Sequence, residues 1–164
     1  MFLSFSELQD CIQKAEDSGA CSSDIQKLRQ ITLVEEFVKH PKCAFFFFFY
    51  SRFILKERWP EAEEFIRQDP KWAYLYSLDV LRGRWVEAEE VIRQEPEWAY
   101  RYSRYIIQRR WYEAEEVIRQ DPEWAYLYSL DVLQGRWPEA EGVIRKNPEW
   151  SCWYSTYIYN LFQG

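Results

Sequence analysis

A tandem repeat of 26 residues constrains the fold of this chain more than any other feature of its sequence. The repeat is marked by four tryptophans and four prolines, each set spaced 26 residues apart: Trp59, Trp85, Trp111 and Trp137, and Pro70, Pro96, Pro122 and Pro148. A period of about 20 to 50 residues is typical of arrays in which each repeat is one supersecondary unit that folds by stacking on its neighbours. We therefore expect a repeat architecture.

A fifth, degenerate repeat precedes these four. Ser51 lies 26 residues before Ser77, the first of four equivalent serines, whereas Pro41 lies 29 residues before Pro70. This difference indicates three extra residues within the phenylalanine run of the degenerate repeat. The sequence thus predicts an N-terminal helical cap at 1–32, a degenerate repeat at 33–58 and four tandem repeats at 59–164, all within one continuous domain.

Each repeat is expected to form a hairpin of two short helices, with bounds near 60–68 and 70–82 in repeat 1. Pro60 falls at the first position of the first helix, where its missing N–H costs nothing. Because a residue before proline avoids helical angles, this helix should end at Asp69. The residues placed to cap the second helices are Asp69, Glu95, Asp121 and Asn147.

The second helices should end at glycine. Gly83 and Gly135 are expected to adopt the left-handed conformation that terminates a helix. Small residues such as Ala62, Ala73 and Ser77 recur where helix backbones must approach closely. Isolated helices below roughly 12–15 residues are marginal in water, so stacking must stabilise them. The sequence therefore predicts an all-α fold, an α-solenoid of 26-residue helix-hairpin repeats with an N-terminal helical cap.

Aromatic residues make up 20% of the chain, and we assign most of them to the core. Trp72, Trp98 and Trp124 recur at a spacing expected of residues packed between hairpins. A sugar-binding platform is the alternative, but it requires exposed rings, whereas these lie at buried spacing.

Residues 1–32 are expected to form two capping helices. Ser6 is placed to cap the first, and the second should start after Asp24. The apolar face of the first would comprise Phe5, Leu8, Cys11, Ile12 and Ala15. This segment lacks a basic start followed by an apolar core and a cleavage site, so a secretory signal is not expected.

Composition narrows the classes of partner. The longest apolar run, Cys43–Tyr50, is far shorter than the roughly 20 residues of a membrane span. Four cysteines show no metal-type spacing, and a reduced, cytoplasmic environment is their simplest explanation. A net charge of −6 disfavours broad contact with phosphate backbones, so nucleic acid is not an expected partner.

No pattern in the sequence indicates catalysis, a cofactor or a metal site. The one histidine, His40, precedes Pro41 as the capping residues precede later prolines. Glu61, Glu63 and Glu64 recur in nearly every repeat, whereas an active site is normally single. These carboxylates are therefore expected to form a solvated face that complements the helix dipole. We expect a protein that is not an enzyme.

The repeats differ mainly in their second helices, and the differences alternate. Repeats 1 and 3 read SLDV at 77–80 and 129–132, whereas the others read SRFI, SRYI or STYI. One equivalent position is thus occupied by Phe53, Asp79, Tyr105, Asp131 and Tyr157. These side chains are expected either to form a carboxylate–phenol ladder between adjacent hairpins or to face a partner.

Repeat 2 combines arginine and tyrosine, the residue types enriched at binding hot spots. Its arginines either pair with glutamates of neighbouring repeats or contact a protein partner; a small nucleotide contact is a further alternative. The candidate partner-binding residues are Arg101, Arg104, Tyr105, Arg109 and Arg110, together with Asp79 and Asp131.

The chain ends in SCWYSTYIYNLFQG, with apolar residues that no further hairpin follows. A large exposed apolar patch usually marks an interface. The candidate residues for self-association as a homodimer are Trp153, Tyr157, Tyr159, Leu161 and Phe162, with the run Ala44–Tyr50 as a second candidate surface. The alternative is that these side chains fold back onto repeats 3 and 4.

The repeat resembles one found in tandem-repeat proteins encoded by bacteriophages and large DNA viruses. GRWPEAEGVI at 135–144 and DPEWAY at 121–126 are similar to their R-W-P-E-A-E…D-P-E-W-A-Y unit, and the likeness covers 59–150 well and 33–58 loosely. It implies a viral accessory protein in the host cytoplasm that binds and inhibits a host protein, such as a defence factor. A self-assembling structural protein and an acidic mimic that blocks a nucleic-acid-binding groove are the alternatives.

Overall fold

The computed structural model describes residues 10, 12–14, 16–17, 19 and 43–159. The chain divides into two compact units, Met1–Arg82 and Gly83–Gly164, and the division falls in the loop between repeats 1 and 2. Every regular element in the described residues is a helix, which confirms the all-α helical-repeat fold class.

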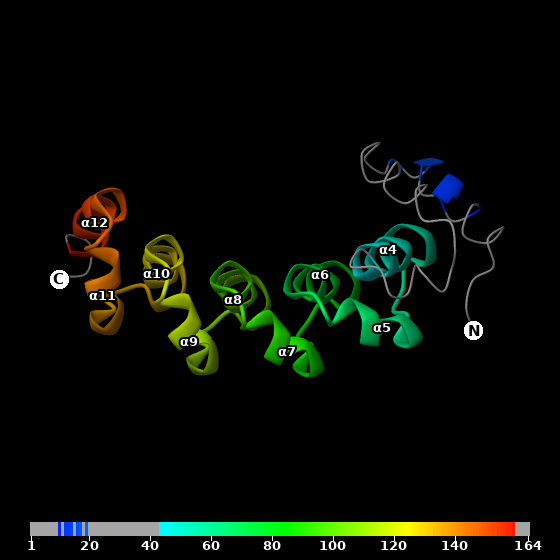
Figure 1. The fold of residues 1–164 in the computed structure, drawn as a ribbon, viewed down its shortest axis with the longest axis horizontal. Helices are drawn as coiled ribbons and strands as arrows, with labels where there is room; N and C mark the ends of the chain where they lie inside the picture. The colour runs from blue at the N-terminus through cyan, green and yellow to red at the C-terminus, as the bar shows by residue number, and fades with distance from the viewer. Residues whose placement is uncertain (1–9, 11, 15, 18, 20–42, 160–164) are drawn as a thin grey trace. The chain divides into compact units, whose positions relative to one another are not determined.

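Each tandem repeat is a hairpin whose second helix is α-helical in its first half and π-helical in its second. Unit 1 contains α4 (Cys43–Phe49) with η1 (Tyr50–Leu55), α5 (Pro60–Ile66), and α6 (Pro70–Tyr76) with η2 (Ser77–Leu81). Unit 2 contains α7 (Val86–Ile92), α8 (Pro96–Tyr102) with η3 (Ser103–Ile107), α9 (Tyr112–Ile118), α10 (Pro122–Tyr128) with η4 (Ser129–Leu133), α11 (Pro138–Ile144), and α12 (Pro148–Tyr154) with η5 (Ser155–Tyr159). Within unit 2, α10 packs against both α8 and α12, and the first helices alternate with them (Figure 1).

The helix starts agree with the sequence prediction at all but one position. Pro60 and Pro138 occupy the first turn of their helices. The Asp69 carboxylate accepts a hydrogen bond from the Trp72 backbone N–H at 3.1 Å, and Asp121 and Asn147 cap α10 and α12 in the same way. The prediction for Glu95 is wrong, because its side chain makes no capping bond. Its extra methylene group makes glutamate a poorer match than aspartate or asparagine to this short local contact.

A buried serine lies at the junction between the α- and π-helical halves. Ser77, Ser103 and Ser129 are fully buried, and each hydroxyl donates a 2.8 Å hydrogen bond to the carbonyl four residues earlier. The backbone N–H of each serine also bonds to this carbonyl and to the one three residues earlier, so the i−4 carbonyl accepts two hydrogen bonds from the same residue. The small hydroxyl thus adds a buried contact where the α-helix passes into the π-helical turn.

The prediction that glycine terminates the second helices is wrong. The left-handed residue is the one before the glycine, Arg82 with φ 54° and Gln134 with φ 51°, and Gln108 and Lys56 hold the same place. In each case its N–H bonds to the carbonyl of the junction serine five residues earlier. The π-helical turn thus fixes the position of the left-handed residue, whether or not glycine follows.

Two sets of tryptophan differ in burial. Trp85, Trp111 and Trp137, which open the repeats of unit 2, are buried with exposed fractions of 2–4%. Trp72, Trp98 and Trp124 were expected in the core, but they are only half-buried. They lie at the edges of the second helices, where Trp124 packs against the Tyr100 ring of the preceding hairpin at 5.6 Å. The predicted burial is therefore wrong for this second set.

The phenylalanine run forms α4 in unit 1, and Ala44 to Phe49 are all buried. Phe47 contacts Trp59 and Phe65, whereas Phe45 and Phe48 contact Trp72. A helix that is apolar all round is expected to be buried on all sides. The run therefore fills the interior of unit 1, and it does not present the exposed surface that a second candidate for self-association requires.

Most of the predicted N-terminal cap lies outside the described residues, as does His40. Within the described part, Asp10, 12–14 and 16–17 are helical, and Ile12 is buried as its place on the predicted apolar face requires. Ala62, Ala73 and Ser77 are also buried, which confirms small residues at close helix contacts.

Replacing the buried Trp111 by alanine should lower the free energy of unfolding by about 3–5 kcal/mol, the range for emptying a large aromatic site. The matched control is the adjacent residue, Tyr112, which is 69% exposed. Tyr112→Ala should change the free energy by less than about 0.5 kcal/mol. Urea denaturation of the full chain measures both, and equal losses would contradict the assignment of inner and outer faces.

Candidate protein-binding surface

An internal polar network recurs in every tandem repeat and fixes which side chains face outward. In repeat 2, Arg84 binds both carboxylate oxygens of Glu89 at 2.8 Å. The Tyr102 hydroxyl donates to the same carboxylate at 3.2 Å and accepts the Trp85 backbone N–H at 2.7 Å. The two helices of one hairpin are thereby joined by four polar groups, each of which is partnered.

The same network occurs in the other three repeats. It consists of Arg58, Trp59, Glu63 and Tyr76 in repeat 1, Arg110, Trp111, Glu115 and Tyr128 in repeat 3, and Arg136, Trp137, Glu141 and Tyr154 in repeat 4. In unit 2 the tyrosine rings of the network also contact the following hairpin: the Tyr102 ring contacts Trp111, and the Tyr128 ring contacts Trp137. The network is therefore structural, and its carboxylate and phenol groups are engaged within the chain.

The prediction of one solvated glutamate face is wrong for the middle glutamate of each set. The side chains of Glu63, Glu89 and Glu115 are only 12–14% exposed because each is held by arginine and tyrosine. The third glutamate, such as Glu90, is exposed as predicted. The signal that could have separated them is a tyrosine 13 residues after the middle glutamate in every repeat.

A second polar contact joins one hairpin to the next within each unit. In unit 2, Asp131 binds the Arg104 guanidinium and the Tyr100 hydroxyl, and in unit 1 Asp79 binds Arg52. The alternation read from the sequence thus corresponds to an arginine of one repeat paired with an aspartate of the next. The expected carboxylate–phenol ladder is corrected accordingly: the phenol is Tyr100 rather than Tyr105, and the main counter-charge is arginine.

The arginines of repeat 2 are mostly engaged within the chain. Arg101 pairs with Glu97 at 2.9 Å and lies 5.7 Å from the ring centroids of both Trp98 and Trp124. Arg104 pairs with Asp131, and Arg110 pairs with Glu115. Arg109 is exposed. All three pairs are with acidic residues, but only the Arg104–Asp131 pair joins neighbouring repeats, and its acid is an aspartate rather than the expected glutamate. The role of these arginines toward a partner stays a prediction.

The side chains left outward on the second helices of unit 2 form the surface that we call the outer stripe. Its residues lie four apart on each helix and hence on one face; they are Arg101 and Tyr105, Leu127 and Asp131, and Trp153 and Tyr157. Three of the six are exposed aromatics, with Tyr105 at 43%, Trp153 at 44% and Tyr157 at 40%. Exposed aromatic side chains grouped on one face are typical of interaction surfaces.

The exposure of Tyr157 does not come from the absence of a following hairpin. Tyr105 holds the equivalent position on η3, which packs against η4, and its ring is as exposed as that of Tyr157. Ser155 behaves differently, because it is exposed whereas Ser103 and Ser129 are buried. The outer stripe is therefore a lateral surface of the repeats, and Trp153 and Tyr157 belong to it.

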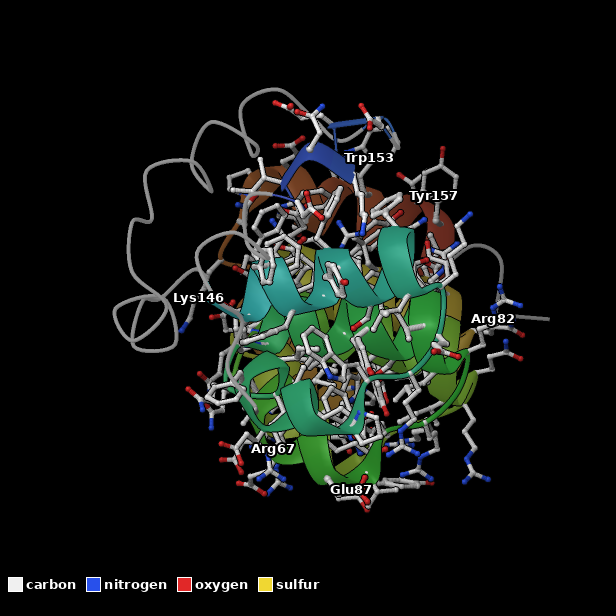
Figure 2. The ribbon with its side chains drawn as sticks, turned by 90° about the vertical axis from the view of Figure 1, so that its right-hand side faces the viewer. Arg67, Arg82, Glu87, Lys146, Trp153 and Tyr157 are labelled. Carbon is white, nitrogen blue, oxygen red and sulfur yellow. The ribbon has the colours of Figure 1, made fainter. Side chains whose placement is uncertain are left out.

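Trp153 and Tyr157 stack on each other with ring centroids 5.5 Å apart and an interplanar angle of 21°. Figure 2 shows the two side chains next to one another. Of the other predicted self-association residues, Leu161, Phe162 and the side chain of Tyr159 lie outside the described residues.

Over the described part of the chain, no group of three or more histidine, cysteine or acidic residues is arranged to hold a metal ion. Cys152 is an exposed free thiol. No helix in the described residues is long and apolar enough to cross a membrane. Comparisons with protein-family models, with curated protein sequences and with solved structures found no match to this chain.

The network tyrosines should titrate later than an ordinary tyrosine. Burial raises the pKa of Tyr76 to about 12, and it also raises the pKa of Tyr102 and Tyr128, with the neighbouring glutamates adding to the effect. Absorbance at 295 nm should therefore show a group of tyrosines that ionises well above the ordinary tyrosine pKa of about 10.

The folded state holds these protons more tightly than the unfolded state, whose tyrosines titrate near pH 10. The contribution of these tyrosines to the free energy of unfolding should therefore be fully present below about pH 10 and fall as the pH rises toward 12. Tyr128→Phe should remove one of these late-titrating groups. Ionisation of every tyrosine of the folded chain near pH 10 would contradict the network.

Proposed function

We propose that this chain is a non-enzymatic binding protein that contacts a protein partner through the outer stripe of unit 2. The observation that carries the proposal is the set of exposed aromatic rings at Tyr105, Trp153 and Tyr157 on one lateral surface. Tyrosine, tryptophan and arginine are the side chains that dominate binding energy at protein interfaces. All three types lie on this stripe.

The internal contacts support a rigid binding surface. The repeat networks hold each hairpin in one conformation, and Asp131 ties repeat 3 to Arg104 of repeat 2. A surface that is ordered before binding loses less conformational entropy on association. Of the stripe, only Tyr105, Trp153 and Tyr157 are strongly exposed, so they are the side chains through which it gains apolar contact.

The likeness of the repeat to those of bacteriophages and large DNA viruses supports a more specific proposal. On this view the chain is a viral accessory protein in the host cytoplasm, and its partner is a host protein, such as a defence factor, that it inhibits. This step rests on the resemblance, because fold alone does not determine function.

The test compares proteins retained from a host lysate by the wild-type chain and by two variants. Trp153→Ser with Tyr157→Ser removes two exposed aromatics of the outer stripe. Loss of a hot-spot aromatic typically costs about 2 kcal/mol or more, so the partner should bind at least about 30-fold more weakly. Titration calorimetry with the purified partner measures the change.

Tyr112→Ser is the matched control because Tyr112 is more exposed than any stripe residue but lies on a first helix. It should bind the partner as the wild type does. Equal retention by both variants would place the interface elsewhere, and the absence of any saturable partner would refute the proposal.

Self-association is the second candidate function. The stacked pair of Trp153 and Tyr157 favours it, because the pair of one copy can cover the same pair of a second copy in a two-fold contact. Light scattering of the intact chain should then show a dimer that Trp153→Glu with Tyr157→Glu converts to a monomer. A monomer at every concentration would exclude this candidate and leave the heterologous partner.

A further inference from the structure

Arginine side chains of this protein cover its exposed aromatic rings, with one exception. Among the described residues, the Arg104 guanidinium lies 5.1 Å from the ring centroid of Tyr105, and that of Arg110 lies 4.5 Å from Tyr112. Trp153 and Tyr157 are comparably exposed, yet the only ring contact that either makes in this part of the chain is with the other. They lack a cation.

The sequence difference between repeats 2 and 4 explains the exception. At the position of Arg104 repeat 4 has Thr156, and at the position of Arg101 it has Trp153. Thr156 is exposed and donates its hydroxyl hydrogen bond to the Cys152 carbonyl, so it leaves the Tyr157 ring uncovered. Repeat 4 thus keeps the tyrosine that lies under Arg104 in repeat 2, and neither of the two arginines has a charged equivalent.

The acidic member of the arrangement is also present in repeat 4. In repeat 2, Glu97 forms the ion pair with Arg101, one helical turn away. Glu149 is its equivalent in repeat 4; it is exposed and lies four residues before Trp153 on the same helix face. A carboxylate and two stacked aromatic rings therefore lie at the positions that hold Glu97, Arg101 and Tyr105 in repeat 2.

We propose that Glu149, Trp153 and Tyr157 form a receptor for an arginine side chain of the protein partner. Two of these groups have equivalents that contact a guanidinium in repeat 2: Glu97, the equivalent of Glu149, pairs with Arg101, and Tyr105, the equivalent of Tyr157, lies under Arg104. Trp153 adds a second ring beside Tyr157. A cation over the face of tryptophan or tyrosine is attracted by the negative charge density of the ring. Arginine adds planar stacking and an ion pair with the carboxylate, which lysine matches less well. The inference rests on the proposed function and names what the outer stripe recognises.

The test uses the full chain and a short capped peptide that contains arginine, with the same peptide carrying neutral citrulline as the matched probe. Binding is followed by NMR through the indole N–H of Trp153, whose signal is assigned by its loss in Trp153→Phe. The arginine peptide should give a saturable shift. The citrulline peptide should bind about tenfold more weakly, as expected for the loss of roughly one cation–π contact and its ion pair.

A substitution taken from repeat 2 supplies the decisive variant. Thr156→Arg should place the chain's own guanidinium over Tyr157, as Arg104 lies over Tyr105, and lower peptide affinity by about tenfold. The fold accepts arginine at this position in repeat 2. Thr156→Gln is the matched control, because it is long but uncharged and should leave binding unchanged.

Equal affinity for the arginine and citrulline peptides would overturn the inference, as would full binding by Thr156→Arg. These outcomes are separate from a failure of the proposed function, since no host protein is present. If a partner is retained from the lysate but the arginine peptide does not bind, only the arginine receptor is refuted. If the arginine peptide binds but no partner is retained from the lysate, only the proposed function is refuted.

Discussion

The tyrosine in the middle of each second helix holds its hairpin together, and in repeats 2 and 3 it also connects the hairpin to the next. Tyr102 accepts the backbone N–H of Trp85 through its hydroxyl, which closes its own hairpin, and its ring lies against Trp111 of the following hairpin. Helices of seven residues with short π-helical extensions are too short to persist alone. One side chain that links both helices of a hairpin to the next hairpin therefore makes a stack of such short elements stable.

Much of this fold could be predicted from the sequence because its signals are local. Proline at the first turn and aspartate before the next proline define the helix starts, and the 26-residue spacing defines the hairpin. The left-handed residue could not be predicted, because it depends on the π-helical turn beyond Ser77 or Ser129. Glycine is a reliable marker of helix ends only when the last turn is α-helical.

The candidate surface was harder to predict, because residues of the same type have different contacts and different exposure. Glu89 and Glu90 are adjacent in sequence, yet the first is held by Arg84 and Tyr102 while the second is exposed. From the sequence, Tyr157 is expected to be exposed because no hairpin follows it, whereas Tyr105 is about equally exposed although a hairpin lies beside it. Residue type alone does not separate a side chain that belongs to the framework from one that faces outward; the separation needs the contacts, or a recurrent spacing such as that from Glu89 to Tyr102.

Framework and surface occupy opposite faces of the same second helix. Ala125, Tyr128 and Ser129 are buried and pack toward the interior. Leu127 and Asp131 lie on the outer stripe. Outward positions differ between repeats while the inward ones hardly change. Substitution at an outward position therefore leaves the hairpin intact, and duplication of a hairpin copies the framework together with a new outward position. An array built in this way can change what it contacts without changing how it folds.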